Sequence, residues 1–373
     1  MSYESIDNLQ RSLSATVFQH TKDAKKAAGR ALGTIVEIIT YYILKEWGFT
    51  DQILIERPLP EYGNVSISHN VEFSFHPIFS KQTLKDIDER PLTSARLLRY
   101  AGGVIPAGSK RKNNKLISKD ALLRNACVIA EDNQFVYMAS LDEKINSMVN
   151  ISCLHIKPFA TVECKRVGVE DGCKKGPQTI EKAKQGAYVA RMTSSLQKIR
   201  DGKGVINGVI YDDEGTPIIK PYSTLLDEIV NNRNDLLKSF ILSIGVVSNH
   251  GNWFTQENQN KELKVLAQSY DWLLFLIDNG LAQFVSDLLL FPRKGYEAVQ
   301  SAFVNSYREG KKQNVFTKTM IDYDAHVALT KYFNQNIKVV EGWFNVIAPQ
   351  ESSVDALKDM LNTLRLKKWE EIL

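Results

Sequence analysis

Hydrophobic and polar residues first form a clear pattern near the start of the chain. An apolar stripe at helical spacing is formed by Leu32, Ile35, Val36, Ile39 and Ile43. It predicts a core helix that begins at Ala28 and ends near Gly48. Glu37 lies beside this stripe, where a carboxylate would be partly buried and would need a partner. The simpler alternative is an edge position from which Glu37 reaches water.

Strand patterns follow this helix. Apolar and polar residues alternate over residues 65–79, and other strand patterns cover 52–57, 134–141, 153–165 and 205–211. A further helix is expected from Pro177, a residue that is tolerated in a first helical turn, and this helix would carry Gln185. Strands that alternate with helices predict an α/β fold with a mixed central sheet flanked by helices.

The pattern changes to long helical segments after Tyr222. Helices are expected over residues 225–244, 262–291, 297–307 and 326–347, with a last helix from Ser353. We therefore expect two parts. Residues 1–222 would form the core, and residues 223–373 would form a C-terminal helical region that serves as a scaffold or in dimerisation.

Charge is distributed unevenly along the chain. The net charge is only +4, but residues 1–222 carry +6 and residues 223–373 carry −2. Residues 90–124 hold nine cationic residues and one acid, which is the charge expected of a phosphate-binding loop, although a solvated surface loop is an equal alternative. Such a loop would be mobile without its ligand. The DNA-binding candidates are Arg96, Arg99, Lys110, Arg111, Lys112 and Lys115, together with Lys174 and Lys175 in a later loop. A later run, Arg308, Lys311, Lys312 and Lys318, could also touch a DNA backbone.

Several protein classes lack support in the sequence. No run of 18 apolar residues occurs and the N-terminus is polar, so we expect a cytoplasmic location and no membrane partner. The four cysteines form no C-x-x-C pair, which gives no sign of a disulfide framework or a structural zinc. Neither a phosphate-binding G-x-x-x-x-G-K-[ST] motif nor an H-E-x-x-H motif is present.

The most informative stretch for chemistry is residues 158–166. A run of strand-forming residues leads into Glu163 and Lys165, which lie two apart and so point to the same face of a strand. A carboxylate there can hold a divalent cation, while the ammonium group favours a hydroxide beside it. Asp142, at the end of the preceding strand, could converge with Glu163. Two carboxylates and a lysine suit Mg²⁺, although an exposed Glu-x-Lys is more commonly a solvated surface pair.

These residues, in this order of elements, resemble the catalytic core of the PD-(D/E)xK nuclease superfamily, and most closely that of type II restriction endonucleases. The resemblance covers roughly residues 28–222. It implies that Asp142 and Glu163 ligate Mg²⁺ with the backbone carbonyl of Cys164, and that Lys165 orients or deprotonates the attacking water. Glu37 would be an additional acid beside the metal, and Gln185 would lie near the site from the following helix.

Two departures from the family pattern leave alternatives open. The residue before Asp142 is Leu141 rather than proline, so Asp132 or an acid before residue 80, such as Glu72, could replace Asp142. Gln185 and Tyr188 are three apart, which does not match the Q-x-x-x-Y spacing of recombination-type nucleases.

The resemblance implies a Mg²⁺-dependent endonuclease that hydrolyses phosphodiester bonds in double-stranded DNA, and specifically a type II restriction enzyme. A homodimer would match the two-fold symmetry of a palindromic site. Two alternatives remain: a structure-specific or repair nuclease, and a non-catalytic DNA-binding protein in which Glu163 and Lys165 form a surface pair.

Overall fold

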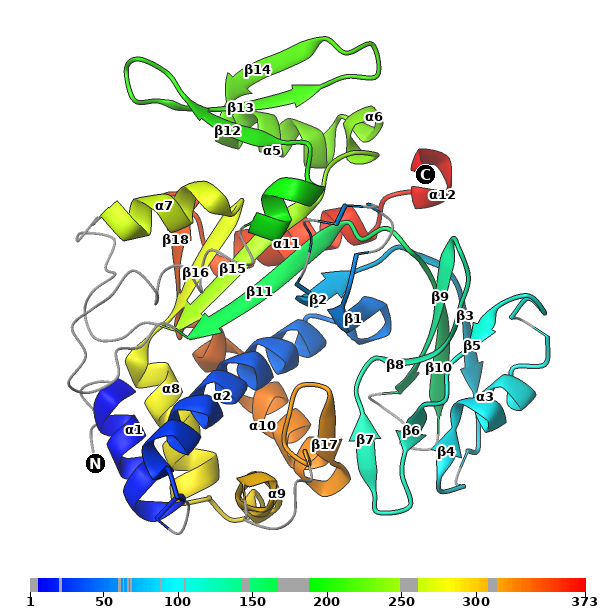
Figure 1. Cartoon of the computed structure of the whole chain (residues 1–373), viewed down its shortest axis with the longest axis vertical. Coiled ribbons are helices and arrows are strands. Elements are labelled where there is room, and N and C mark those ends of the chain that lie inside the picture. Colours follow the sequence, from blue (N-terminus) through cyan, green and yellow to red (C-terminus); the bar gives the residue numbers. More distant parts are fainter. Residues whose placement is uncertain are drawn as a thin grey trace.

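A six-stranded mixed sheet lies at the centre of the protein in a computed structural model of the chain (Figure 1). Its order is β1 (Ile53–Arg57), β2 (Val71–Phe75), β11 (Ala160–Arg166), β15 (Leu242–Ser248), β16 (Trp272–Leu276) and β18 (Phe344–Ala348). The strands β11, β15 and β16 are parallel, and the other pairings are antiparallel. The structure describes residues 6–19, 22–59, 62, 64–65, 67, 69–87, 89–103, 105–142, 148–166, 188–248, 261–307 and 314–373.

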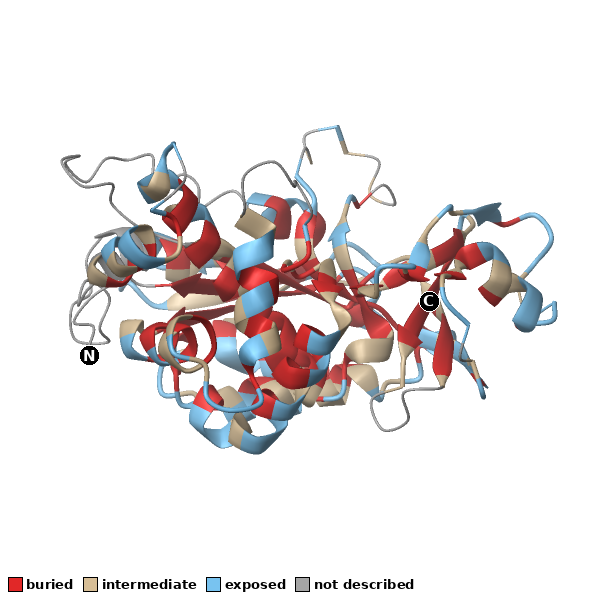
Figure 2. Cartoon of the chain, turned by 90° about the horizontal axis from the view of Figure 1, so that it is seen from below, coloured by how far each residue is buried: buried red, intermediate tan, exposed pale blue. Residues whose placement is uncertain are grey.

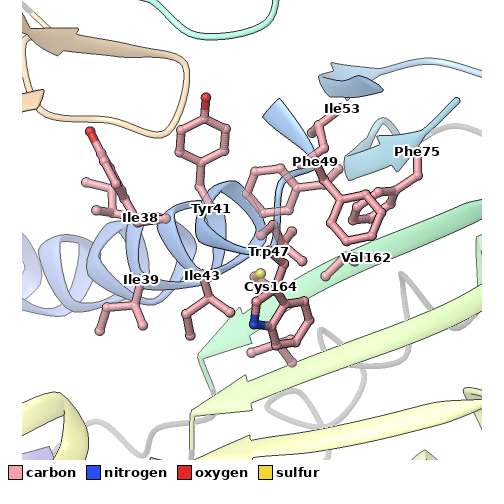
Figure 3. Packing of buried hydrophobic residues seen from close by; sticks show 14 of the residues in the cluster. Ile38, Ile39, Tyr41, Ile43, Trp47, Phe49, Ile53, Phe75, Val162 and Cys164 are labelled. Carbon is pink, nitrogen blue, oxygen red and sulfur yellow. The ribbon is translucent and has the colours of Figure 1, made fainter. Parts of the chain in front are cut away.

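Helices cover both faces of this sheet. On one face, α2 (Ala24–Glu46) and α11 (Val354–Arg365) contact the apolar side chains of β11, β15 and β16. Figure 3 shows α2 packed on this face, with Ile43 and Trp47 beside Val162 and Cys164. On the other face, α7 (Lys261–Ser269) buries Leu266 against Phe275 and its neighbours. Figure 2 shows the resulting buried layer along the strands between exposed helical surfaces.

More helices pack around α2. They are α1 (Ile6–Thr16), α8 (Asp278–Val285), the helical turn η3 (Ser286–Leu290), α9 (Glu297–Tyr307) and α10 (Tyr323–Glu341). Two buried hydrogen bonds connect α2 and the residue after it to α10: Tyr42 Oη lies 2.8 Å from His326 Nδ1, and Trp47 Nε1 donates to Glu341 Oε1 at 2.9 Å. By length and composition α2 could also cross a membrane, and 67% of its apolar window is buried inside the protein.

Residues between β2 and β11 form an inserted part with two further sheets, which we call the inserted module. One sheet is antiparallel, with the order β3 (Ile78–Leu84), β10 (Val149–His155), β9 (Phe135–Leu141), β8 (Cys127–Glu131) and β5 (Lys110–Arg111). The other has the order β17 (Met320–Asp322), β7 (Leu122–Arg124), β6 (Lys115–Ile117) and β4 (Leu92–Thr93), and α3 (Ser94–Tyr100) follows β4. Strand β17 comes from the C-terminal part of the chain, so this sheet ties the inserted module to it.

A small antiparallel sheet projects from the molecule at the top of the view in Figure 1. It has the order β12 (Gln197–Arg200), β13 (Ile206–Tyr211) and β14 (Pro217–Pro221), and it is followed by α5 (Tyr222–Asn231) and α6 (Asn234–Leu237). The short helices η1 (Thr50–Gln52) and α12 (Trp369–Ile372) complete the described elements.

The α/β fold with a mixed sheet flanked by helices is confirmed, as is the core helix with its apolar stripe. The expected helical region after residue 222 is wrong in three places, since β15, β16 and β18 lie there and complete the central sheet. The side chains of β15 and β16 are buried on both faces, and β16 is a continuous apolar run without alternation. Strands from both sides of residue 222 therefore share one sheet.

The basic segment is also not a loop. Residues 90–124 contain α3 and the strands β4 to β7. A few buried apolar side chains anchor this segment, namely Leu92, Leu97, Leu116, Ile117 and Leu123. These residues are sparse in the sequence, but all five belong to the main hydrophobic core, which orders the segment.

Candidate active site

Three glutamates lie side by side across the strands β1, β2 and β11. The register pairs Ile55 with Phe73, and Phe73 with Val162. The next row of the sheet therefore holds Glu56, Glu72 and Glu163. The backbone amide of Glu72 donates to Glu163 Oε2 at 3.3 Å, which connects the two strands at this level.

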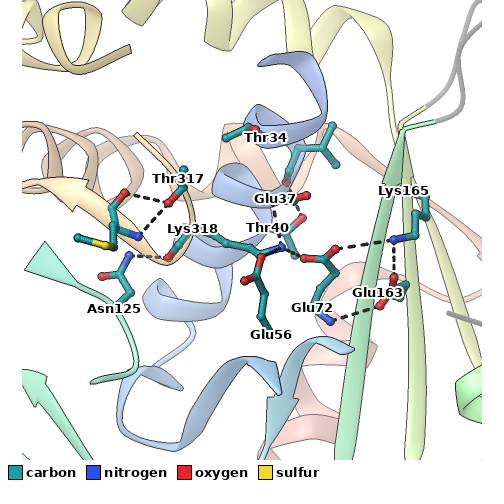
Figure 4. Close-up of polar contacts among 12 residues, drawn as sticks. Thr34, Glu37, Thr40, Glu56, Glu72, Asn125, Glu163, Lys165, Thr317 and Lys318 are labelled. Carbon is teal, nitrogen blue, oxygen red and sulfur yellow. Dashed lines mark hydrogen bonds and ion pairs between the residues drawn. The ribbon is translucent and has the colours of Figure 1, made fainter. Parts of the chain in front are cut away.

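Lys165 lies on the same side of β11 as Glu163. Its Nζ is 2.6 Å from Glu163 Oε1 and 3.7 Å from Glu72 Oε1, so the ammonium group lies between two carboxylates (Figure 4). The prediction that Glu163 and Lys165 share one side is confirmed, and it follows from the period of two along a strand. Glu163 is not a surface residue, because its side chain is only 8% exposed.

A second lysine enters from the C-terminal part of the chain. Lys318 Nζ lies 3.1 Å from Glu37 Oε2 on α2 and 3.2 Å from Glu56 Oε1, and it also forms an ion pair with Glu72 Oε2. Its side chain is 4% exposed. We call these six residues, Glu37, Glu56, Glu72, Glu163, Lys165 and Lys318, the glutamate–lysine cluster (Figure 4).

The backbone around Lys318 is fixed by two sets of hydrogen bonds. Thr317 closes a tight turn, because its amide donates to the Met320 carbonyl at 2.8 Å and its hydroxyl accepts from the Met320 amide at 2.9 Å. Asn125, in the inserted module, donates from Nδ2 to the Lys318 carbonyl at 2.8 Å and from its amide to the Thr319 carbonyl at 2.9 Å. The inserted module therefore holds the turn that carries Lys318.

The electrostatics of the cluster favour cations. Carboxylates directly opposite each other on neighbouring strands repel, and here three of them lie in one row with Glu37 beside them. Burial raises the pKa of Glu163, and Lys165 beside it opposes that rise only in part. Glu56 also has a left-handed backbone with φ of 51°, which costs a residue with a Cβ roughly 1–2 kcal/mol. Unfavourable features of this kind concentrate at functional sites.

The structure brings together most of the residues that the sequence suggested for catalysis. Glu37, Glu163 and Lys165 belong to the cluster, and Cys164 lies between the last two with its side chain buried toward α2. Glu37 is partly buried and partnered by Lys318, as its position beside an apolar stripe predicted. Gln185 lies outside the described residues.

Asp142 lies elsewhere. It follows β9 in the five-stranded sheet, where Asn150 Nδ2 donates to Asp142 Oδ2 at 3.4 Å and also contacts Asp51 at 3.5 Å. Asp51 comes after the end of α2, whereas Glu37 lies nine residues before the last helical residue, Glu46, or about 14 Å along the axis. The predicted convergence of Asp142 with Glu163 fails because their strands belong to different sheets.

Glu72, one of the two alternatives to Asp142, takes the place beside Glu163. The other alternative, Asp132, closes a turn before β9, where its Oδ1 accepts from the amides of Gln134 and Phe135 at 2.9 and 2.8 Å. The structure therefore selects Glu72 as the strand acid nearest to Glu163.

The predicted DNA-binding cations that the structure describes all lie on the inserted module. Arg99, Lys110, Arg111 and Lys115 are exposed. Arg96 is partly engaged, since its Nη1 donates to the Pro91 carbonyl at 2.8 Å, and Lys112 forms an ion pair with Glu131. Lys174 and Lys175 lie outside the described residues. The expectation that Lys318 touches a DNA backbone is corrected, because its ammonium group faces the glutamates.

Sequence reasoning missed the roles of Glu56 and Lys318. Glu56 is the residue before the end of the expected strand 52–57, so a search for acids near strand ends would have found it. Lys318 has no local signal, since it is one lysine in a turn about 150 residues from Lys165, and only the pairing of β7 with β17 brings it to the cluster.

The donor atoms of the cluster suit a hard divalent cation. Mg²⁺ prefers one or two carboxylates together with several waters and substrate phosphate oxygens, and Glu72 and Glu163 can supply the carboxylates, with the Cys164 carbonyl as a further oxygen donor. Among the residues that the structure describes, no three His, Cys, Asp or Glu side chains are arranged to hold a metal as they stand. Two ammonium groups lie among the carboxylates instead, and Lys165 is a stand-in cation between Glu72 and Glu163. The oxygen donors present suit Mg²⁺ by their chemistry, and an ion between Glu72 and Glu163 would take the place that the Lys165 ammonium group holds in this structure.

Comparisons of the chain with protein-family profiles, with curated proteins and with solved structures found no match.

Proposed function

We propose that the protein is a Mg²⁺-dependent endonuclease that hydrolyses phosphodiester bonds in double-stranded DNA. The observation that carries this proposal is the placement of Glu72 opposite Glu163 with Lys165 between them. The order of elements adds support. A core helix with Glu37, two strands of which the second carries Glu72 near its start, the strand with Glu163 and Lys165, and a later parallel strand follow one another as in the family that the sequence resembles.

The chain's own residues can divide the work of hydrolysis. Glu72, Glu163 and the Cys164 carbonyl would hold Mg²⁺, which neutralises charge that builds on the phosphate oxygens. Lys165 would orient the attacking water and stabilise the hydroxide that forms as its proton leaves. The water oxygen then bonds to phosphorus while its proton passes to solvent, the bond to the 3′ oxygen breaks, and that oxygen takes up a proton from solvent.

The inserted module supports DNA as the substrate. Its exposed cations Arg99, Lys110, Arg111 and Lys115 can bind phosphates, a contact that gives affinity without sequence recognition. The module contacts the turn of Lys318 through Asn125, so this phosphate-binding surface is physically joined to the cluster. Cleavage at a palindromic site would need a homodimer, and we extend the proposal to a type II restriction enzyme of that form.

The burial of Glu163 argues against the non-catalytic alternative. A surface pair of glutamate and lysine would be exposed on both sides, but Glu163 is 8% exposed and close to a second acid. Burying like charges together costs several kcal/mol of folding free energy, and a protein that needed only a surface contact would gain nothing from it.

Plasmid cleavage tests the proposal. Purified protein is incubated with plasmid DNA and Mg²⁺, beside the variants Glu163→Gln and Lys165→Ala. The matched control is Glu228→Gln, which removes one charge from an unrelated ion pair in which Lys220 Nζ lies 2.6 Å from Glu228 Oε2. Discrete DNA bands from the wild type and from Glu228→Gln, but from neither site variant, would support a restriction enzyme.

Other outcomes separate the alternatives. Cleavage of branched or damaged DNA in place of discrete plasmid bands would favour a repair nuclease. DNA binding without cleavage, unchanged by Glu163→Gln, would favour the non-catalytic protein. Cleavage by both site variants at the wild-type rate would refute the assigned site.

A further inference from the structure

Lys318 is an unusual component of a metal-binding acid cluster. It contributes a positive charge from a distant turn, its side chain is 4% exposed, and its ammonium group contacts three carboxylates. Ion pairs on a protein surface contribute little, but a buried ammonium group among several carboxylates is a fixed cation. Lys318 is therefore a structural part of the glutamate–lysine cluster.

The two lysines divide the cluster into two cation positions that share Glu72. Lys165 lies between Glu72 Oε1 and Glu163 Oε1. Lys318 lies among Glu37, Glu56 and Glu72 Oε2. A carboxylate that bridges two cations is the arrangement found in enzymes that use two metal ions a few ångströms apart, where one ion faces the attacking oxygen and the other the leaving oxygen.

We propose that Lys318 permanently fills the second cation position, so that this nuclease works with one divalent ion. The inference rests on the proposed function and specifies how many divalent ions the site binds. Four carboxylates and two ammonium groups give the cluster a formal charge of −2, which a single divalent ion neutralises.

The position of Lys318 favours a fixed charge over a mobile one. Its turn is held by the Thr317 hydroxyl and by Asn125, whose side chain is buried. Lys165, in contrast, is 25% exposed, and its ion pairs among the described residues are with Glu163 on its own strand and Glu72 on the neighbouring one, so its side chain can turn aside when a cation binds. The two lysines therefore have different roles although both contact Glu72.

Counting bound ions tests the inference directly. Mn²⁺ is titrated into the full-length protein without DNA, and free Mn²⁺ is followed by electron paramagnetic resonance, with calorimetry in parallel. We expect about one Mn²⁺ per wild-type chain and about two per chain of Lys318→Ala, because three carboxylates then lose their cation. Lys318→Arg keeps the charge and should bind about one ion, as the wild type does. This conservative variant also keeps the test informative where Lys318→Ala is too unstable to purify.

A second readout uses the ligands of the proposed second position. Glu56 is 57% exposed, so Glu56→Gln is tolerated by the fold. Added to Lys318→Ala, it should weaken the second Mn²⁺ at least about tenfold and leave the first unchanged. Two ions bound by the wild type, or one ion bound with unchanged affinity by Lys318→Ala, would overturn the inference while the nuclease function stands. No bound ion and no cleavage by the wild type would remove both proposals.

Discussion

Mg²⁺ should raise the melting temperature of the wild-type protein and should raise that of Glu163→Gln much less. Without metal, the row of Glu56, Glu72 and Glu163 holds like charges on neighbouring strands, with Lys165 and Lys318 as the only described cations in ion-pair contact with it. A divalent ion bound between Glu72 and Glu163 removes this repulsion only in the folded state. Metal binding must therefore appear as an increase in stability.

The size of the effect follows from linkage. An ion present at about 100 times its dissociation constant adds about 2.7 kcal/mol to the free energy of unfolding. The entropy of unfolding is about 2.1 cal/mol/K per residue, which for 373 residues is roughly 0.8 kcal/mol/K. The melting temperature of the wild type should then rise by about 3 °C.

Glu163→Gln should change the melting temperature without metal as well as the increase that Mg²⁺ causes. The pKa of Glu163 is raised mainly by burial, so the folded protein disfavours its charged form, and a neutral residue of the same shape removes that cost. The variant should melt above the wild type in a chelating buffer and should lose most of the Mg²⁺ response. Glu228→Gln should keep the full response, because its partner Lys220 lies on β14, outside the cluster.

Differential scanning calorimetry in a chelating buffer and in excess Mg²⁺ measures both shifts. The reasoning is refuted if Mg²⁺ raises the melting temperature of Glu163→Gln as much as that of the wild type. It is also refuted if Glu163→Gln melts below the wild type without metal, because the carboxylate would then be stabilising the fold.

Three further predictions concern other residues. Glu72→Gln should lower the rate of DNA cleavage at least about 1000-fold, whereas Asp142→Asn should change it less than tenfold, and the opposite result in single-turnover assays would restore Asp142 to the site. Replacing Lys110 and Arg111 together by alanine should lower the slope of log K against log salt by about 2 in DNA-binding titrations, and an unchanged slope would place DNA on another surface. Burial raises the pKa of Asp271 from 3.8 to about 6, so the folded state binds its proton more tightly than the unfolded state does. The free energy of unfolding should therefore fall by up to about 3 kcal/mol between pH 4 and pH 6. Denaturant titrations of Asp271→Asn should show a flatter dependence of this free energy on pH, and an equally steep one would contradict the prediction.

The parts of the fold that a local pattern determines could be predicted from the sequence. The stripe of α2 is one such part, and all five of its residues are buried. The pairing of Glu163 with Lys165 is another, because a period of two fixes their side of β11. In both cases the evidence lies within a few neighbouring residues.

The parts that depend on distant pairing could not be predicted. Strand β16 is buried on both faces, so its continuous apolar run reads as part of a helical segment. Asp142 follows a plausible strand, and Glu72 lies within another. Only the assignment of these strands to different sheets shows which of the two acids lies beside Glu163. Lys318 reaches the cluster because β17 pairs with β7, a contact between residues about 200 positions apart.

The register of β1, β2 and β11 therefore brings the glutamates of the proposed site together, and apolar residues set that register. Ile55, Phe73 and Val162 form the row next to the glutamates, and their packing fixes which residues are opposite each other. A shift of β2 by one residue would turn Glu72 to the other face of the sheet and place Phe73 beside Glu163. The charge row would then be broken, and Lys318 would lose the carboxylate that it shares with the Lys165 position. The same hydrophobic packing that stabilises the central sheet thus keeps the repelling carboxylates together, and it leaves their neutralisation to two lysines and the proposed cation.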